Sequence, residues 1–98
     1  MATPSTKIRT LHVRIEGRVQ GVGYRYWTEQ TALALGIDGW VRNRRDASVE
    51  ALFSGSQGAV AEMLDRCRSG PRLASAVVVT VLDEDARAVS GFEILTTI

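Results

Sequence analysis

Apolar and polar residues alternate along residues 7–16 with the two-residue period of a strand that buries one face. Shorter stretches with strand character follow at 37–43, 49–53, 75–82 and 91–97. In the first of these shorter stretches, the alternation places Val41 and Asn43 on the same face. The pattern therefore predicts five strands, interrupted by two stretches with a different period.

Those two stretches have the spacing of helices that bury one side. The first covers 24–35 and stops at Gly36, because glycine readily adopts the left-handed conformation that ends a helix. The second begins after Ser56, a favoured N-cap residue, and stops before Gly70. The residues on the buried sides are Tyr24, Trp27, Thr31 and Leu35 in the first helix and Val60, Met63, Leu64 and Cys67 in the second.

The order of elements is strand, helix, strand, strand, helix, strand and one terminal strand. Each helix connects two strands, and such crossovers are right-handed. Two crossovers around a hairpin predict an α+β fold, the ferredoxin-like (split βαβ) two-layer sandwich. Both helices would cover one face of a mostly antiparallel sheet of four or five strands and leave the other face bare. We expect one domain over residues 1–98, with 1–6 as a disordered tail.

Composition adds few constraints on partners. The formal net charge of the 98 residues is +1, which gives no reason to expect a nucleic-acid or membrane partner. The single cysteine cannot form a disulfide within the chain. No apolar run is long enough to span a bilayer, and the first residues lack the apolar core of a signal peptide. We therefore expect a cytoplasmic protein.

The connection between the first strand and the first helix, GRVQGVGYR at 17–25, contains three glycines. Glycines let consecutive backbone N–H groups converge on an anion, and the helix N-terminus that follows favours the same charge. Arg25 in the first turn opposes the helix dipole unless an anion lies between them, and its guanidinium can hold two phosphate oxygens. A tight connection followed by a solvated arginine explains the same residues. These physical considerations leave both interpretations open.

The sequence of this loop resembles the G-x-V-Q-G-V-x-x-R signature of the acylphosphatase family. A second family signature, around G-W-V-x-N-x-x-D-G-x-V-E, is matched at 39–50, and further similarity extends over about 8–94. The resemblance implies the ferredoxin-like fold already predicted from the pattern. It also implies an enzyme that hydrolyses the carboxyl-phosphate bond of acyl phosphates to a carboxylate and inorganic phosphate, without a metal or any other cofactor.

The same resemblance assigns roles to individual residues. Arg25 takes the place of the phosphate-binding arginine, and Asn43 takes the place of the asparagine that positions the attacking water. Backbone N–H groups complete the phosphate site, and they belong to Gln20, Gly21, Val22, Gly23 and Tyr24. The expected partners are a small acyl phosphate as substrate and inorganic phosphate as product and inhibitor.

The residues near the loop suit this chemistry. A carboxylate leaving group has a conjugate-acid pKa of about 4, so it departs without a general acid. Phosphoryl transfer then depends on positioning and on charge stabilisation. The loop contains no histidine, cysteine or carboxylate, and Asn43 can orient water but cannot deprotonate it. We expect the proton to pass to a phosphate oxygen of the substrate.

Two other classes of function compete with the hydrolase for this sequence. An RNA-binding sheet of this fold needs stacking aromatic residues on its bare face, and Trp40 stands alone there in the pattern. A regulatory or accessory domain of a larger enzyme is the other alternative. The presence of both Arg25 and Asn43 favours the hydrolase over an inactive domain of this kind.

Several further residues carry expectations of their own. Ala47 replaces the glycine that usually follows the aspartate of the second signature, so a positive φ there would strain it. The fourth strand is expected at a sheet edge, and its uncharged run 76–82 offers a dimer interface as the alternative to the monomer that we expect. Packing in the core is expected for Cys67 and for the tyrosines and tryptophans, and solvent exposure for His12. A solvated hairpin is expected for Arg42, Arg44 and Arg45, with attraction of anionic substrates to the site as the alternative.

Overall fold

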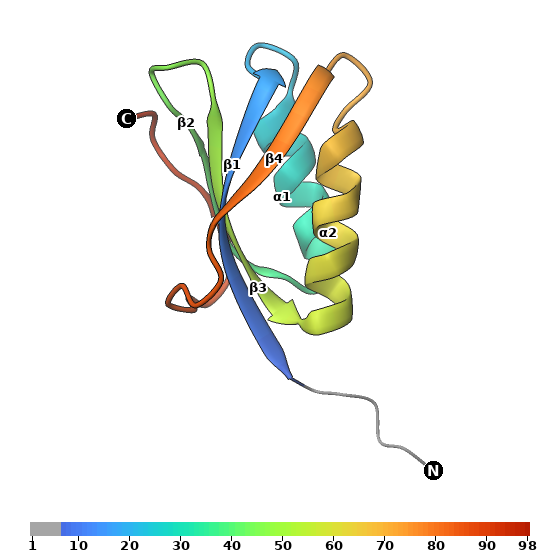
Figure 1. Ribbon diagram of the computed structural model, residues 1–98, viewed down its shortest axis with the longest axis vertical. Coiled ribbons are helices and arrows are strands. Elements are labelled where there is room, and N and C mark those ends of the chain that lie inside the picture. The colour runs from blue at the N-terminus through green and yellow to red at the C-terminus, as the bar shows by residue number, and fades with distance from the viewer. Residues whose placement is uncertain (1–6) are drawn as a thin grey trace.

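A computed structural model describes residues 7–98 (Figure 1), and the expected tail at 1–6 lies outside these residues. The elements alternate as the periodicity predicts. In chain order they are β1 (Ile8–Arg18), α1 (Tyr24–Ala34), β2 (Asp38–Asn43), β3 (Val49–Ser56), α2 (Gln57–Ser69), β4 (Ser75–Asp83) and β5 (Phe92–Ile94).

The strands form one five-stranded mixed sheet in the order β4-β1-β3-β2-β5. Neighbouring pairs are antiparallel except for β2 and β5, which run parallel. Both helices pack on the same face of this sheet (Figure 1). The predicted ferredoxin-like α+β sandwich is confirmed, and so is the position of β4 at an edge.

The core lies between the sheet and the helices. Leu11, Val13 and Ile15 of β1 are fully buried there, in the alternation that the sequence predicts. The helices contribute the largest buried side chain, Tyr24, whose hydroxyl donates a hydrogen bond of 2.7 Å to the carbonyl oxygen of Cys67. Because this bond ties the first turn of α1 to the last turn of α2, it fixes the helix end that follows the glycine-rich loop.

The face away from the helices is less bare than the pattern suggests. Glu50, Leu52 and Ser54 of β3 point to that face and are buried, because β3 is the central strand. The rings of His12 and Trp40, which flank Leu52 in the sheet register, lie 5.7 Å apart and cover it. Trp40 therefore packs within the protein instead of offering a flat surface for a nucleobase.

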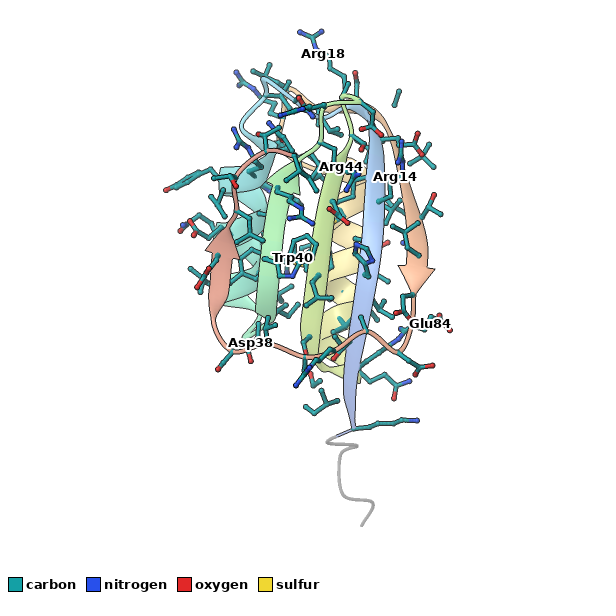
Figure 2. The ribbon with its side chains drawn as sticks, turned by 90° about the vertical axis from the view of Figure 1, so that its left-hand side faces the viewer. Arg14, Arg18, Asp38, Trp40, Arg44 and Glu84 are labelled. Atoms are coloured by element: carbon teal, nitrogen blue, oxygen red, sulfur yellow. The ribbon has the colours of Figure 1, made fainter. Side chains whose placement is uncertain are left out.

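Residues 84–91 carry the chain from one edge of the sheet to the other across the face without helices (Figure 2). A bridge between Thr10 and Asp85 fixes the start of this crossing segment. At its end, Gly39 N–H donates to the Gly91 carbonyl and Gly91 N–H donates to the Asp38 carboxylate, at 2.8 and 3.2 Å. The crossing segment thereby brings β5 to its parallel pairing with β2.

In the hairpin between β2 and β3, Ala47 has a positive φ, the condition under which strain is expected there. Arg44 N–H donates to the Ser48 carbonyl, and Ala47, which follows the tight turn, has φ of 76°. A non-glycine residue in this left-handed region lowers the stability of the fold by roughly 1 kcal/mol. The hairpin therefore holds its geometry against a local strain.

Replacing Ala47 by glycine is expected to stabilise the fold by about 1 kcal/mol, which corresponds to a rise in melting temperature of about 4–8 °C. Urea or thermal unfolding measures this change. The matched control is Ala61→Gly at an exposed interior position of α2, where glycine is expected to destabilise the helix by about 1 kcal/mol. A lower melting temperature for Ala47→Gly would show that the turn is not strained.

Candidate active site

The glycine-rich loop connects β1 to α1 at one end of the sheet (Figure 1). Its first residue, Gly17, still belongs to β1, where an added Cβ would collide with the Ala76 carbonyl oxygen of β4. Gly21 and Gly23 have positive φ of 72° and 78°, and an added Cβ at either position would meet open space. Gly17 therefore allows strand packing, while the two later glycines line an open concavity.

Helix α1 begins directly at this concavity. Gly23 is its N-cap in the left-handed conformation and provides no side-chain hydrogen bond to the first turn. The first turn also contains no acidic residue. Because the first N–H groups of a helix lack intrahelical partners, this helix end favours a negatively charged ligand.

A cavity of about 300 Å³ lies at the start of α1. It brings together three of the residues expected in the backbone site with both expected side chains. The residues that line it are Val19, Gly21, Gly23, Tyr24, Arg25, Tyr26, Asn43 and Ile94. Val22, in contrast, packs in the hydrophobic core.

A larger hollow of about 410 Å³ lies at the other end of the sheet, beside Arg9, Gln57 and Glu84. Arg9 and Glu84 lie 3.4 Å apart there, so the arginine already faces a carboxylate. The larger volume therefore does not mark the better anion site. The residue chemistry favours the smaller cavity.

Arg25 is half-buried at the smaller cavity. Its guanidinium has no hydrogen-bond or ion-pair partner within residues 7–98. A half-buried arginine without a partner retains a full set of donors for an anionic ligand.

Asn43 is the last residue of β2 and reaches the same cavity from the sheet. Its side-chain oxygen Oδ1 is buried and has no hydrogen-bond partner in the described part of the chain. A buried amide oxygen without a donor costs free energy that a bound water would recover. The carbonyl of this side chain is therefore available to accept a hydrogen bond from water at the cavity.

Gln20 connects the loop to the hairpin that carries Asn43. Its Nε2 donates to two hairpin carbonyls, 2.7 Å from the oxygen of Arg44 and 2.8 Å from that of Ser48. Sequence reasoning considered only the backbone N–H of Gln20 and missed this contact, because it joins segments more than 20 residues apart. The side chain holds the two halves of the site at a fixed separation.

Substituting Gln20 with alanine is expected to lower kcat by about tenfold, because the loop and Asn43 would no longer be held together. Gln20→Glu should lower kcat further, since a carboxylate would face two carbonyl oxygens. Steady-state kinetics and thermal unfolding of both variants, with Gln57→Ala as an exposed glutamine control, test this. Wild-type turnover in both variants would remove the positioning role.

A buried carboxylate supports the hairpin from the face without helices. Glu50 Oε1 accepts from Arg42 Nε at 2.7 Å and from Arg44 Nη1 at 3.0 Å, and its Oε2 lies 2.6 Å from His12 Nε2. Burial alone would raise the pKa of Glu50, but the hydrogen bonds from Arg42, His12 and Arg44 hold that pKa below its usual value. The arginines are therefore fixed to Glu50, and Figure 2 shows Arg44 on this face.

These contacts correct two expectations from the sequence. His12 is not a freely solvated strand residue, because its Nε2 contacts the buried Glu50 carboxylate. Arg42 and Arg44 are half-buried rather than freely solvated, since both pair with the same carboxylate and Arg42 also lies 4.7 Å over the Trp40 ring. Arg45 is exposed, as expected. Cys67 is buried as expected, whereas Tyr26 is 65% exposed at the cavity instead of packing in the core.

The lowered pKa of Glu50 predicts a pH-dependent stability. A carboxyl whose pKa is lower in the folded state stabilises the fold above its unfolded pKa, which is about 4.3, and this contribution disappears as pH falls through the folded value. Glu50→Gln is therefore expected to lower the melting temperature at pH 7 and to differ less from wild type at pH 3.5. Thermal unfolding at both pH values provides the measurement. An equal difference at both would contradict the ionised pairing.

Asp46 fixes the tip of the same hairpin. Its Oδ1 accepts from Ser48 Oγ at 2.6 Å and from Ser48 N–H at 3.0 Å, and its Oδ2 accepts from Arg14 Nη2 at 2.7 Å. Hydrogen bonds from Ser48, followed by those from Arg14, lower the pKa of Asp46 to about 2. The carboxylate therefore stays ionised and keeps the turn in place at ordinary pH.

The described residues contain neither a group of metal ligands nor a helix suited to cross a membrane. Among residues 7–98, no three His, Cys, Asp or Glu side chains are grouped so that they could hold a metal ion. The helices within those residues are also too short and too polar to cross a membrane.

Comparison with known proteins identifies relatives that are named acylphosphatase. The acylphosphatase family model matches residues 11–94. An acylphosphatase from Rhodopseudomonas palustris strain BisB5 is 53% identical over 96% of this chain and 99% of its own. One from Nitrobacter winogradskyi is 69% identical, over 63% of each chain. The structure of an acylphosphatase from Coxiella burnetii superimposes with a TM-score of 0.79 and 25% identity over 95% of this chain and all of its own.

Proposed function

The chain belongs to the acylphosphatase family of acyl-phosphate hydrolases, and from this premise we propose that the cavity beside Arg25 and Asn43 is its active site. In this proposal the loop backbone from Gln20 to Tyr24 and the guanidinium of Arg25 hold the phosphoryl group. Asn43 holds the attacking water. The observation that carries the proposal is that two polar groups without a partner in residues 7–98, the Arg25 guanidinium and Asn43 Oδ1, meet at one cavity with the glycine-rich loop.

The reaction follows from this arrangement. The water oxygen held by Asn43 attacks phosphorus, the bond between phosphorus and the acyl oxygen breaks, and its electron pair leaves with the carboxylate. One water proton passes to a phosphate oxygen, so an acyl phosphate dianion and water give a carboxylate and dihydrogen phosphate. The positive charge of Arg25 and the N–H groups of the loop stabilise the charge on the phosphoryl oxygens in the transition state.

Hydrolysis of benzoyl phosphate in the presence of a chelator tests the activity directly. The wild-type protein is expected to release benzoate and phosphate in equal amounts, and added inorganic phosphate is expected to inhibit by competition for the same loop. A folded wild-type protein without this activity would refute the proposal.

We also propose that the protein works as a monomer, with pairing through β4 as the alternative. The edge strand β4 exposes Val78 and Leu82 and carries no charge from 76 to 82. Such an edge can pair with a second copy. Light scattering distinguishes a mass near 10.7 kDa from its double.

A further inference from the structure

The proposed active site is larger than its phosphate requires. A water molecule occupies about 30 Å³ in the liquid, and the cavity measures about 300 Å³. A phosphoryl group and the attacking water therefore fill only part of it. The remainder must accommodate the acyl part of the substrate, which the glycine-rich loop does not recognise.

Two apolar side chains form the part of the cavity that is neither loop nor catalytic residue. Tyr26 follows Arg25 in the first turn of α1 and is 65% exposed. Ile94 ends β5 and is 40% exposed. Both line the cavity, and together they form what we call the apolar rim.

The sheet holds the second member of the apolar rim in place. Ile94 pairs with Val41 in the parallel register of β5 and β2, two residues before Asn43 on the same strand face. Phe92, two residues earlier in β5, stacks on Phe53 with ring centroids 6.3 Å apart. Parallel pairing therefore makes Ile94 a neighbour of Asn43 at the cavity, although 51 positions separate them in the sequence.

Charge limits which acyl groups suit this rim. Among the residues that line the cavity, Arg25 is the one charged side chain, and the phosphoryl group uses it. These lining residues include no second cation that could bind the carboxylate of a charged acyl group. An aromatic or aliphatic acyl group would instead cover exposed parts of Tyr26 and Ile94.

We propose that Tyr26 and Ile94 form an acyl subsite that selects uncharged apolar acyl phosphates, aromatic ones above all. This inference rests on the proposed function and names the substrate class of that same cavity. It assigns substrate discrimination to two residues outside the phosphate loop, one from the first helix and one from the terminal strand.

The test compares kcat/KM for benzoyl, acetyl and succinyl phosphate in the wild type and in three variants: Tyr26→Ala, Ile94→Ala and Leu33→Ala. Leu33 is the matched control, because it is 56% exposed on the same helix but does not line the cavity. The wild type is expected to prefer benzoyl to acetyl phosphate and to use succinyl phosphate least. Tyr26→Ala and Ile94→Ala should each reduce the benzoyl-to-acetyl ratio by about 3- to 10-fold, a size typical of one aromatic or aliphatic contact.

The outcomes separate the subsite from the function. If Tyr26→Ala keeps the wild-type inhibition constant for inorganic phosphate and reduces the benzoyl-to-acetyl ratio of kcat/KM, this result would support a role confined to the acyl group. Unchanged ratios in both rim variants, with normal wild-type hydrolysis, would overturn the subsite and leave the hydrolase intact. Absence of hydrolysis of all three substrates by the folded wild type would overturn the proposed function itself. Tyr26→Phe should keep the wild-type ratio, because the ring supplies the contact.

Discussion

Replacement of Arg25 by alanine is expected to lower kcat/KM for benzoyl phosphate by at least about 100-fold and to weaken inhibition by inorganic phosphate. The guanidinium is half-buried, unpaired within residues 7–98 and the one charged side chain among the residues that line the cavity. Loss of one preorganised charge-stabilising contact typically costs about 3 kcal/mol in the transition state. In the proposed site Arg25 contacts the phosphoryl group before and during the reaction, so both KM and kcat should respond.

The design includes two further arginine variants. Arg25→Lys keeps the charge but loses the planar fork, so its activity should fall between wild type and Arg25→Ala. Arg18→Ala is the matched control, since Arg18 is exposed at the end of β1 and extends away from the body of the protein in Figure 2. Near-normal hydrolysis by folded Arg25→Ala would overturn the assignment.

Replacement of Asn43 by alanine should affect turnover far more than phosphate binding. We expect kcat to fall at least about 100-fold, while the inhibition constant of inorganic phosphate stays close to wild type, because the loop and Arg25 remain. Steady-state kinetics with phosphate as inhibitor separates the two effects. A variant that loses phosphate inhibition but retains kcat would reverse the proposed roles.

The same substitution has an expected effect on stability that a structural asparagine would not show. Asn43 Oδ1 is buried without a partner in residues 7–98, so its removal eliminates an unsatisfied acceptor. The melting temperature of Asn43→Ala is therefore expected to equal or exceed that of the wild type. Asn43→Asp keeps the shape but places a negative charge beside the phosphoryl group, so it should lose activity and phosphate affinity together. A large drop in the stability of Asn43→Ala would indicate a supporting role in the sheet.

Much of the fold could be predicted because period and turn residues are local signals. The two helices were expected at 24–35 and after Ser56, and Ser56 indeed caps α2 through a bond of 3.2 Å from Ala59 N–H. The strand ends were less accurate. β3 continues to Ser56 because Ser54, which resembles a turn residue, is buried and hydrogen-bonded to Thr10 at 2.8 Å. This pairing between distant strands leaves no trace in the local pattern.

The proposed site divides in the same way. Arg25 and Asn43 could be proposed from the sequence, because each belongs to a contiguous motif, and the structure places both at one cavity. The hydrogen bonds from the Gln20 side chain to the hairpin could not be predicted, because they join distant segments. The position of Ile94 in the apolar rim could not be predicted either, because it depends on the parallel pairing of β5 with β2. Sequence reasoning thus reaches the proposed phosphate side of the cavity and misses the proposed acyl side.

The crossing segment 84–91 makes the two sides of the proposed site differ in how easily their backbone unfolds locally. β5 has three residues, a single neighbouring strand and a covalent connection that spans the width of the sheet, whereas β3 is central and buried on both faces. Amide protons of β5 should therefore exchange with solvent sooner than those of β3. Local opening of β5 moves Ile94 but leaves the loop and Arg25 in place. In the proposed site, such opening would admit acyl groups of different size while the scissile phosphorus keeps one position.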